Sequence, residues 1–291
     1  MSGLNVLISG IFLLILCALS FSGLDICRKK LSEKYSAFRI LTLVMGAQIP
    51  LYALWYVFSP STNVSFDSYA PWGISDIFLN LSANILIVMS LRLSPLSNAI
   101  PLLALTPTFA LLFQPFFNIP LSTSQILGAV IIFAGAIILN GFPKLKDKKD
   151  KGLFYMFCAA FCCGLIILFD RQCLQFAPIP FHGLVQTVGM TTLSLIAERV
   201  FKIPQHEMDM SLKEAPWKLW MGASVFAFLA GISQLGSLKF FDPGIVESVK
   251  RALVLFLSVT LGFAVFNESL STRKILGVLF MALGIILTSR H

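Results

Sequence analysis

The segment from Asp242 to Asn267 is apolar and long enough to cross a bilayer, yet it carries Glu247, Lys250 and Arg251 within two helical turns. At about 1.5 Å of rise per residue, the two basic residues lie about 10 Å into a hydrocarbon core about 30 Å thick. A charge at that depth costs a few kcal/mol and usually marks a functional site. We therefore interpret these three charges as a candidate functional cluster.

The composition is that of an all-α polytopic membrane protein. Of the 291 residues, 57% are apolar and only 12% are charged, whereas soluble domains carry about 25% charged residues. The mean hydropathy is +0.84. The uncharged runs predict ten membrane-spanning helices, and the run from Leu93 to Pro143 must hold two of them because Pro115, Asn118 and Pro120 interrupt it.

Basic residues collect in alternate connections between the predicted helices. The odd-numbered connections hold sixteen Lys and Arg residues, starting with Arg28 after the first span, whereas the even-numbered connections and both tails hold three. The positive-inside rule then places the odd connections in the cytoplasm and both termini outside. The basic isoelectric point, about 9.3, follows from these connections. We expect the bilayer as the partner, in a bacterial inner membrane, and no nucleic acid.

The two halves of the chain repeat one another. Eight residues between Leu121 and Ile137 recur 149 positions later between Leu270 and Ile286, among them two glycines in each copy. Cys17-Ala18 likewise recurs 141 positions later. The repetition predicts a duplicated five-helix unit at residues 1–143 and 152–291, joined by a basic cytoplasmic linker at 144–151. An odd number of spans forces the two copies into opposite orientations, as in transporters with inverted repeats.

The charged cluster belongs to one copy only. The matching positions of the first copy are Ala99, Leu102 and Leu103, so the shared fold does not require charge there. One interpretation is an internal ion pair that locks the ninth helix against a neighbour. The favoured interpretation is a site where Lys250 or Arg251 meets an anionic substrate group while Glu247 orients the basic residue or titrates.

Several features resemble a known family. The ten-helix duplication, the glycine-spaced ends of helices five and ten and the run Ser248-Val249-Lys250-Arg251 are similar to the drug/metabolite transporter superfamily, in its EamA-like branch. The Lys250-Arg251 pair also resembles a pair that contacts substrate phosphate in plastid sugar-phosphate translocators. The resemblance implies a secondary transporter with both termini in the cytoplasm, whereas the loop charges place them outside.

Polar residues inside other predicted spans are further candidates for the substrate path. They are Gln48, Asn80, Asn84, Asn98, Ser233, Gln234 and Ser237, with hydrogen bonding between helices as the alternative for each. Pro95, Pro101 and Pro107 predict a bent or broken fourth helix, which would free backbone groups near a site.

Other polar residues receive interfacial or structural interpretations. We expect Asp170-Arg171 and Glu198-Arg199 to be ion pairs at helix ends near the membrane surface. His182 opens the seventh helix, where an interfacial role is favoured over proton transfer. The six cysteines lack a metal-binding spacing and are expected to be packing residues.

These patterns predict a secondary carrier of a small organic anion or zwitterion that works by alternating access. The predicted binding residues are Lys250, Arg251, Glu247, Gln234, Asn84, Asn98 and Gln48, without metal or cofactor. Export of amphipathic cations through Glu247 is the alternative within the same class, and a homodimer is left open. A polytopic membrane enzyme is the rival class, but the sequence contains no hydrolase, metalloprotease or phosphate-binding motif.

Overall fold

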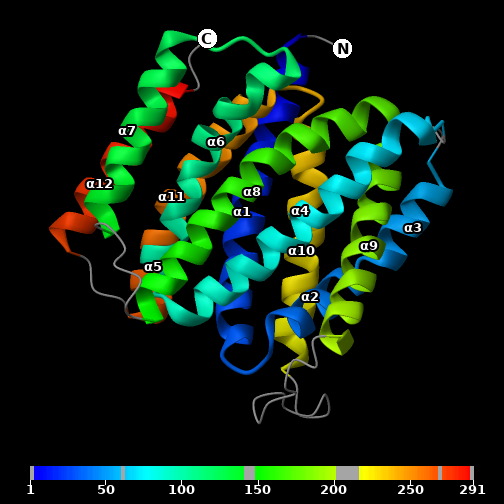
Figure 1. Ribbon diagram of the computed structural model, residues 1–291, viewed down its shortest axis with the longest axis horizontal. Coiled ribbons are helices and arrows are strands. Elements are labelled where there is room, and N and C mark those ends of the chain that lie inside the picture. Colours follow the sequence, from blue (N-terminus) through cyan, green and yellow to red (C-terminus); the bar gives the residue numbers. More distant parts are fainter. Residues whose placement is uncertain (1–2, 60–62, 141–147, 201–215, 268–270, 289–291) are drawn as a thin grey trace.

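A computed structural model describes residues 3–59, 63–140, 148–200, 216–267 and 271–288, and these residues form helices and their connections (Figure 1). The first half contains α1 (Gly3–Ser32), α2 (Ala37–Gly46), α3 (Ile49–Val57), α4 (Phe66–Leu93), α5 (Leu96–Ala99), η1 (Ile100–Leu105), α6 (Thr106–Phe113), η2 (Gln114–Phe117) and α7 (Thr123–Asn140). The second half contains α8 (Lys148–Phe176), α9 (Ile179–Val200), α10 (Trp217–Ser237), α11 (Pro243–Phe266) and α12 (Thr272–Thr288).

The helices group into two sets of five spans, which confirms the predicted fold class. In the first set, α2 and α3 together form the second span, and the pieces from α5 to η2 form the fourth. Six spans of the described chain are long and apolar enough to cross a membrane on those criteria alone. The other four, α7, α9, α11 and α12, are shorter or carry more polar residues, and they complete the two sets.

The two sets run in opposite directions, and equivalent helices of the two sets make equivalent contacts. In Figure 1, α1 descends from the end of the bundle where α12 finishes, whereas its counterpart α8 ascends towards that same end. The first helix of each set packs against the third helix of the other, α1 against α10 and α8 against α4. The fifth helices, α7 and α12, pack against each other. This pattern is expected of inverted repeats related by a pseudo-twofold axis.

The repeated glycines explain how α7 and α12 approach so closely. A Cβ atom added to Gly128 would lie 2.6 Å from the carbonyl oxygen of Gly284, and one added to Gly284 would lie 2.7 Å from that of Gly128. Gly135 similarly faces Gly277, at 2.9 Å from its carbonyl oxygen. The glycines shared by the two sequence copies thus meet across the twofold axis, where small residues let helices pack in lipid.

The fourth span is broken, as its prolines predict. Pro95 precedes α5, Pro101 lies in the first turn of η1, and Pro107 lies in the first turn of α6. A second break, between α2 and α3, was not predicted from the sequence. It falls at Ala47 and Gln48, two residues before Pro50, whose ring removes a backbone donor from the first turn of α3.

The bundle is apolar outside and partly polar inside. One face of α12 exposes large apolar side chains that suit contact with lipid tails, namely Ile275, Leu276, Leu279, Phe280, Leu283 and Ile286. Ionisable side chains of α1, α4, α8, α9 and α11 are instead buried between the helices. Buried charge in a membrane bundle is expensive, so these interior groups identify where a site lies.

Candidate substrate-binding site

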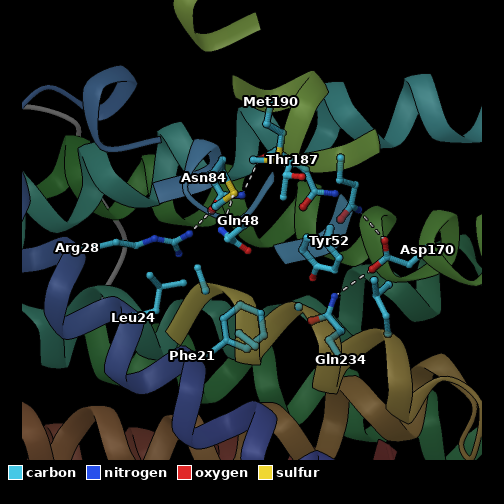
Figure 2. Close-up of a pocket in the computed structure, with 17 residues that line it drawn as sticks. Phe21, Leu24, Arg28, Gln48, Tyr52, Asn84, Asp170, Thr187, Met190 and Gln234 are labelled. Carbon is cyan, nitrogen blue, oxygen red and sulfur yellow. Dashed lines mark hydrogen bonds between the residues drawn. The ribbon is translucent and has the colours of Figure 1, made fainter. Parts of the chain in front are cut away.

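Two adjoining cavities lie between the two repeats. The central cavity, shown in Figure 2, has a volume of about 90 Å³. The second, which we call the basic cavity, has a volume of about 60 Å³. Both cavities are lined by Phe21, Arg28, Asn80, Asn84 and Gln234. Because α1 and α4 come from the first repeat and α10 from the second, the shared wall is built at the repeat interface.

The charged cluster of α11 lines the basic cavity. Lys250 Nζ donates hydrogen bonds to Glu247 Oε1 and, over 2.7 Å, to Gln234 Oε1 of α10. Arg251 Nε donates to Glu247 Oε2 over 3.1 Å. The ammonium group of Lys250 also lies 5.0 Å from the ring centre of Phe21, within cation–π range. The ion pairs join residues of α11, and the hydrogen bond from Lys250 to Gln234 connects the cluster to α10.

A third basic residue, Arg28 of α1, reaches both cavities from the first repeat. It donates to Asn84 Oδ1 and lies 3.6 Å from Asp25 Oδ1, measured from its NH1 nitrogen. From the sequence, Arg28 was expected in a cytoplasmic loop, and that prediction was wrong. α1 continues to Ser32, so Arg28 is still helical and only 4% exposed.

A second buried ionisable group comprises Asp76 of α4, Asp170 of α8 and His182 of α9. His182 Nε2 lies 3.1 Å from Asp170 Oδ1 and 3.8 Å from Asp76 Oδ2. Its Nδ1 lies 2.8 Å from the hydroxyl of Tyr69. Gln186 donates to both carboxylates. We refer to Asp76, Asp170 and His182 as the triad.

The triad corrects two expectations. His182 is not interfacial but fully buried, with 0% exposure. Asp170 does not pair with Arg171, because Arg171 points away and forms an ion pair of 3.0 Å with Asp242. Consecutive helical residues point in directions about 100° apart, so neighbours in sequence cannot both face the same partner.

Gln234 connects the two charged groups. Its side-chain oxygen accepts the hydrogen bond from Lys250, and its Nε2 donates to Asp170 Oδ2 over 3.0 Å. Figure 2 shows Gln234 reaching Asp170 at one end of the central cavity, with Arg28 at the other end. A continuous polar chain thus runs from α11 through α10 to the triad.

Most predicted binding residues meet at these cavities. Glu247, Lys250 and Arg251 line the basic cavity, Gln48 lines the central one, and Asn84 and Gln234 line both. Asn98, on α5, is buried, but it is not among the described residues that line either cavity. Two further candidates, Ser233 and Ser237, donate to carbonyl groups of their own helix.

The sequence did not identify three further site residues, because they lie at or just beyond the ends of uncharged runs: Asp25, Arg28 and Asp76. Asp76 directly precedes the run from Ile77 to Leu91, and Asp25 directly follows the first run. Both helices extend well beyond those runs, to 28 and 30 residues. The spacing of Asp25 and Arg28, three positions apart on one helical face, was the available signal.

The triad also has ligand atoms close enough to hold a metal ion, all within 4.8 Å of one another. However, the amide nitrogen of Gln186 donates a hydrogen bond to each carboxylate and so occupies the side on which they converge. A cation would have to displace or reverse this amide. The donor arrangement therefore fits a hydrogen-bonded group rather than a metal centre.

Inverted five-helix repeats with a polar cavity at their interface are typical of membrane transporters. The EamA-like transporter family matches residues 8–141 and 150–290. The chain belongs to this family, so the predicted transporter, rather than a membrane enzyme, is confirmed, as is a multi-pass membrane protein that acts on small molecules.

Comparison with solved structures supports the same fold. One crystal structure matches with a TM-score of 0.68 over 96% of this chain and 96% of its own, at 15% sequence identity. Comparison with curated proteins gives no significant match.

Proposed function

We propose that this transporter carries a small organic anion, or a zwitterion through its anionic group, and that Arg251, Lys250 and Arg28 bind that group. Alternating access would come from rocking of the two repeats about the cavities between them. The basic residues come from both repeats, so a bound anion would contact both moving parts.

The charges of the basic cavity support this assignment. Three cations, Arg28, Lys250 and Arg251, face two carboxylates, Asp25 and Glu247, which leaves one positive charge in excess when all five ionise. These five residues are at most 5% exposed. A buried excess charge is unfavourable without a counterion, so an anion entering the cavity would relieve this cost.

The geometry of Arg251 is the observation that carries the proposal. Arg251 lines the basic cavity, and its Nε is engaged by Glu247, which is the hydrogen bond that its guanidinium forms among the described residues. A guanidinium offers its two terminal nitrogens as a planar pair of donors that matches carboxylate or phosphate. Glu247 thereby holds the guanidinium in place.

Counterflow uptake into proteoliposomes tests the proposal. The panel would contain labelled sugar phosphates, nucleotides, carboxylates, amino acids and lipophilic cations. We expect uptake of an anionic or zwitterionic compound that falls at least tenfold in Arg251→Ala and Lys250→Ala. The exposed cation Lys239 provides the matched control, and Lys239→Ala should transport normally.

Two outcomes would contradict the proposal. Anion uptake that survives both substitutions would make the α11 cluster structural. Selective uptake of lipophilic cations would favour the alternative function, in which a carboxylate such as Asp170, at the wall of the central cavity, binds the substrate.

A further inference from the structure

In the described part of the chain, the triad is a group of buried ionisable residues that the proposed anion site leaves unexplained. Asp76, Asp170 and His182 come from three helices and both repeats, and each is at most 1% exposed. The hydrogen bonds of His182 and Gln186 to the two carboxylates cross between helices, and Asn80 adds one to Asp76 within α4. Only Asp170 of the three lines the central cavity, which gives the triad one opening towards the transport path.

The charge of the triad is unbalanced unless it takes up a cation. Among the described residues, no lysine or arginine forms an ion pair with either carboxylate. With a neutral imidazole, two ionised carboxylates leave a buried charge of minus two, and a proton on the imidazole halves it. Uncompensated buried charge is costly, so binding a proton lowers the free energy of this arrangement.

The hydrogen bonds allow His182 to gain a proton without losing a partner. With the proton of the neutral ring on Nε2, which faces Asp170, Nδ1 accepts from the Tyr69 hydroxyl. When a proton from water binds to Nδ1, the new N–H donates to the Tyr69 oxygen after the hydroxyl rotates. A hydroxyl can act in both ways.

The other groups around the triad contribute no positive charge in direct contact. The titratable side chains that lie near the triad on the packed helices are Tyr52 of α3, Tyr69 of α4 and Cys173 of α8. From α10, Gln234 approaches Asp170, and Lys250 of α11 lies beyond it, at the far atom of the same amide.

We infer that the triad binds a proton that is transported together with the anion. This inference rests on the proposed function. With His182 neutral, the net charge of the triad, the α11 cluster and the Asp25–Arg28 pair together is minus one. A bound monovalent anion makes this net charge minus two. A proton on the triad returns the total to minus one, so proton and anion favour each other's binding, and Gln234 links the two sites physically.

Asp76→Asn provides the test. Asp76 is not among the residues that line either cavity, and asparagine keeps the shape of the carboxyl group but removes the negative charge that a bound proton would compensate. At fixed membrane potential, a pH gradient of one unit should concentrate the anion about tenfold in wild type, as expected for one proton per anion. We expect Asp76→Asn to keep counterflow within about twofold of wild type but to lose this accumulation. His182→Gln should behave alike, and the exposed carboxylate variant Asp67→Asn should match wild type.

A pH jump without any solute separates this inference from the proposed function. Wild type should give a transient proton-binding current that Asp76→Asn lacks, even if no anion is carried. Equal currents in both, or accumulation retained by Asp76→Asn and His182→Gln, would overturn the proton site. Accumulation that requires sodium or a divalent cation at constant pH gradient would overturn it in favour of a metal ion. Anion counterflow without pH-driven accumulation would overturn cotransport and leave the anion site standing.

Discussion

The start of α11 and the corresponding stretch of the first repeat occupy related places in the fold but differ in chemistry. On α11, Glu247, Lys250 and Arg251 form a buried ionic cluster. In the first repeat, Ala99 ends α5 while Leu102 and Leu103 lie in η1, all three in an apolar core. The duplicated architecture therefore tolerates hydrocarbon at these positions. This difference supports the proposal that the charges on α11 serve transport rather than the fold.

The difference extends to helix geometry. The apolar copy is broken into α5, η1 and α6 at its prolines, whereas α11 is one continuous helix of 24 residues. Continuous helical geometry places residues three and four apart on one face. That geometry lets Glu247 reach both Lys250 and Arg251. A broken helix at the same place could not hold the cluster in this form.

The largest effect should follow from removing the only acidic member of the α11 cluster. Glu247→Leu leaves two buried cations without their carboxylate, which costs about 3–5 kcal/mol. We expect a large loss of folded protein in detergent, measured by thermal unfolding. Unchanged stability would mean that water already solvates Lys250 and Arg251.

The α7–α12 interface is where the repeats remain alike, so a substitution there should affect the fold rather than the site. Gly284→Val places side-chain atoms against the backbone of Gly128 and Ile132, and overpacking of this kind costs about 1–3 kcal/mol. The expected result is a lower unfolding temperature with unchanged substrate affinity in the remaining folded protein. A selective change in affinity would connect this interface to binding.

Arg251→Lys keeps the charge but removes the planar pair of donors. A charge-assisted hydrogen bond contributes about 1.5–3 kcal/mol, so we expect about a tenfold to hundredfold rise in the anion concentration for half-maximal uptake. Concentration-dependent counterflow measures this effect. Unchanged affinity would show that the positive charge alone, and not the planar pair of donors, binds the substrate.

The smallest effect is expected at Asn98, beside the apolar counterpart of the cluster. Because it is not among the described residues that line either cavity, Asn98→Ala should change the initial uptake rate by less than about twofold. Asn84→Ala, in the wall shared by both cavities, serves as the positive comparison. A stronger loss in Asn98→Ala would place the first repeat's broken span in the transport path.

Much of the fold could be predicted from sequence because duplication leaves periodic marks. Gly128 and Gly284 belong to the repeated residues of the two copies, and the prolines of the fourth span predict its break. The break beside Gln48 was missed because it falls inside one uncharged run, from Ile40 to Phe66. Pro50 carried the local signal for this break.

The site was only half predictable, for a physical reason. Lys250 and Arg251 stand out because hydrophobic residues flank them on both sides, whereas Asp76 and Arg28 lie at the ends of apolar runs. Composition cannot distinguish a helix that ends at a charge from one that continues past it. The partners of these residues, such as Asn84 and His182, come from other helices, and only the packed bundle brings them together.

Replacing the cluster with the residues of its own counterpart tests the central claim most directly. The triple variant Glu247→Ala, Lys250→Leu and Arg251→Leu copies Ala99, Leu102 and Leu103 of the first repeat and leaves no unpaired charge on α11. The measurement is counterflow uptake of the transported anion, with thermal unfolding in parallel. We predict a protein about as stable as wild type, and more stable than Glu247→Leu, that no longer transports the anion. A stable triple variant that still transports it would show that the charged cluster is not the substrate site.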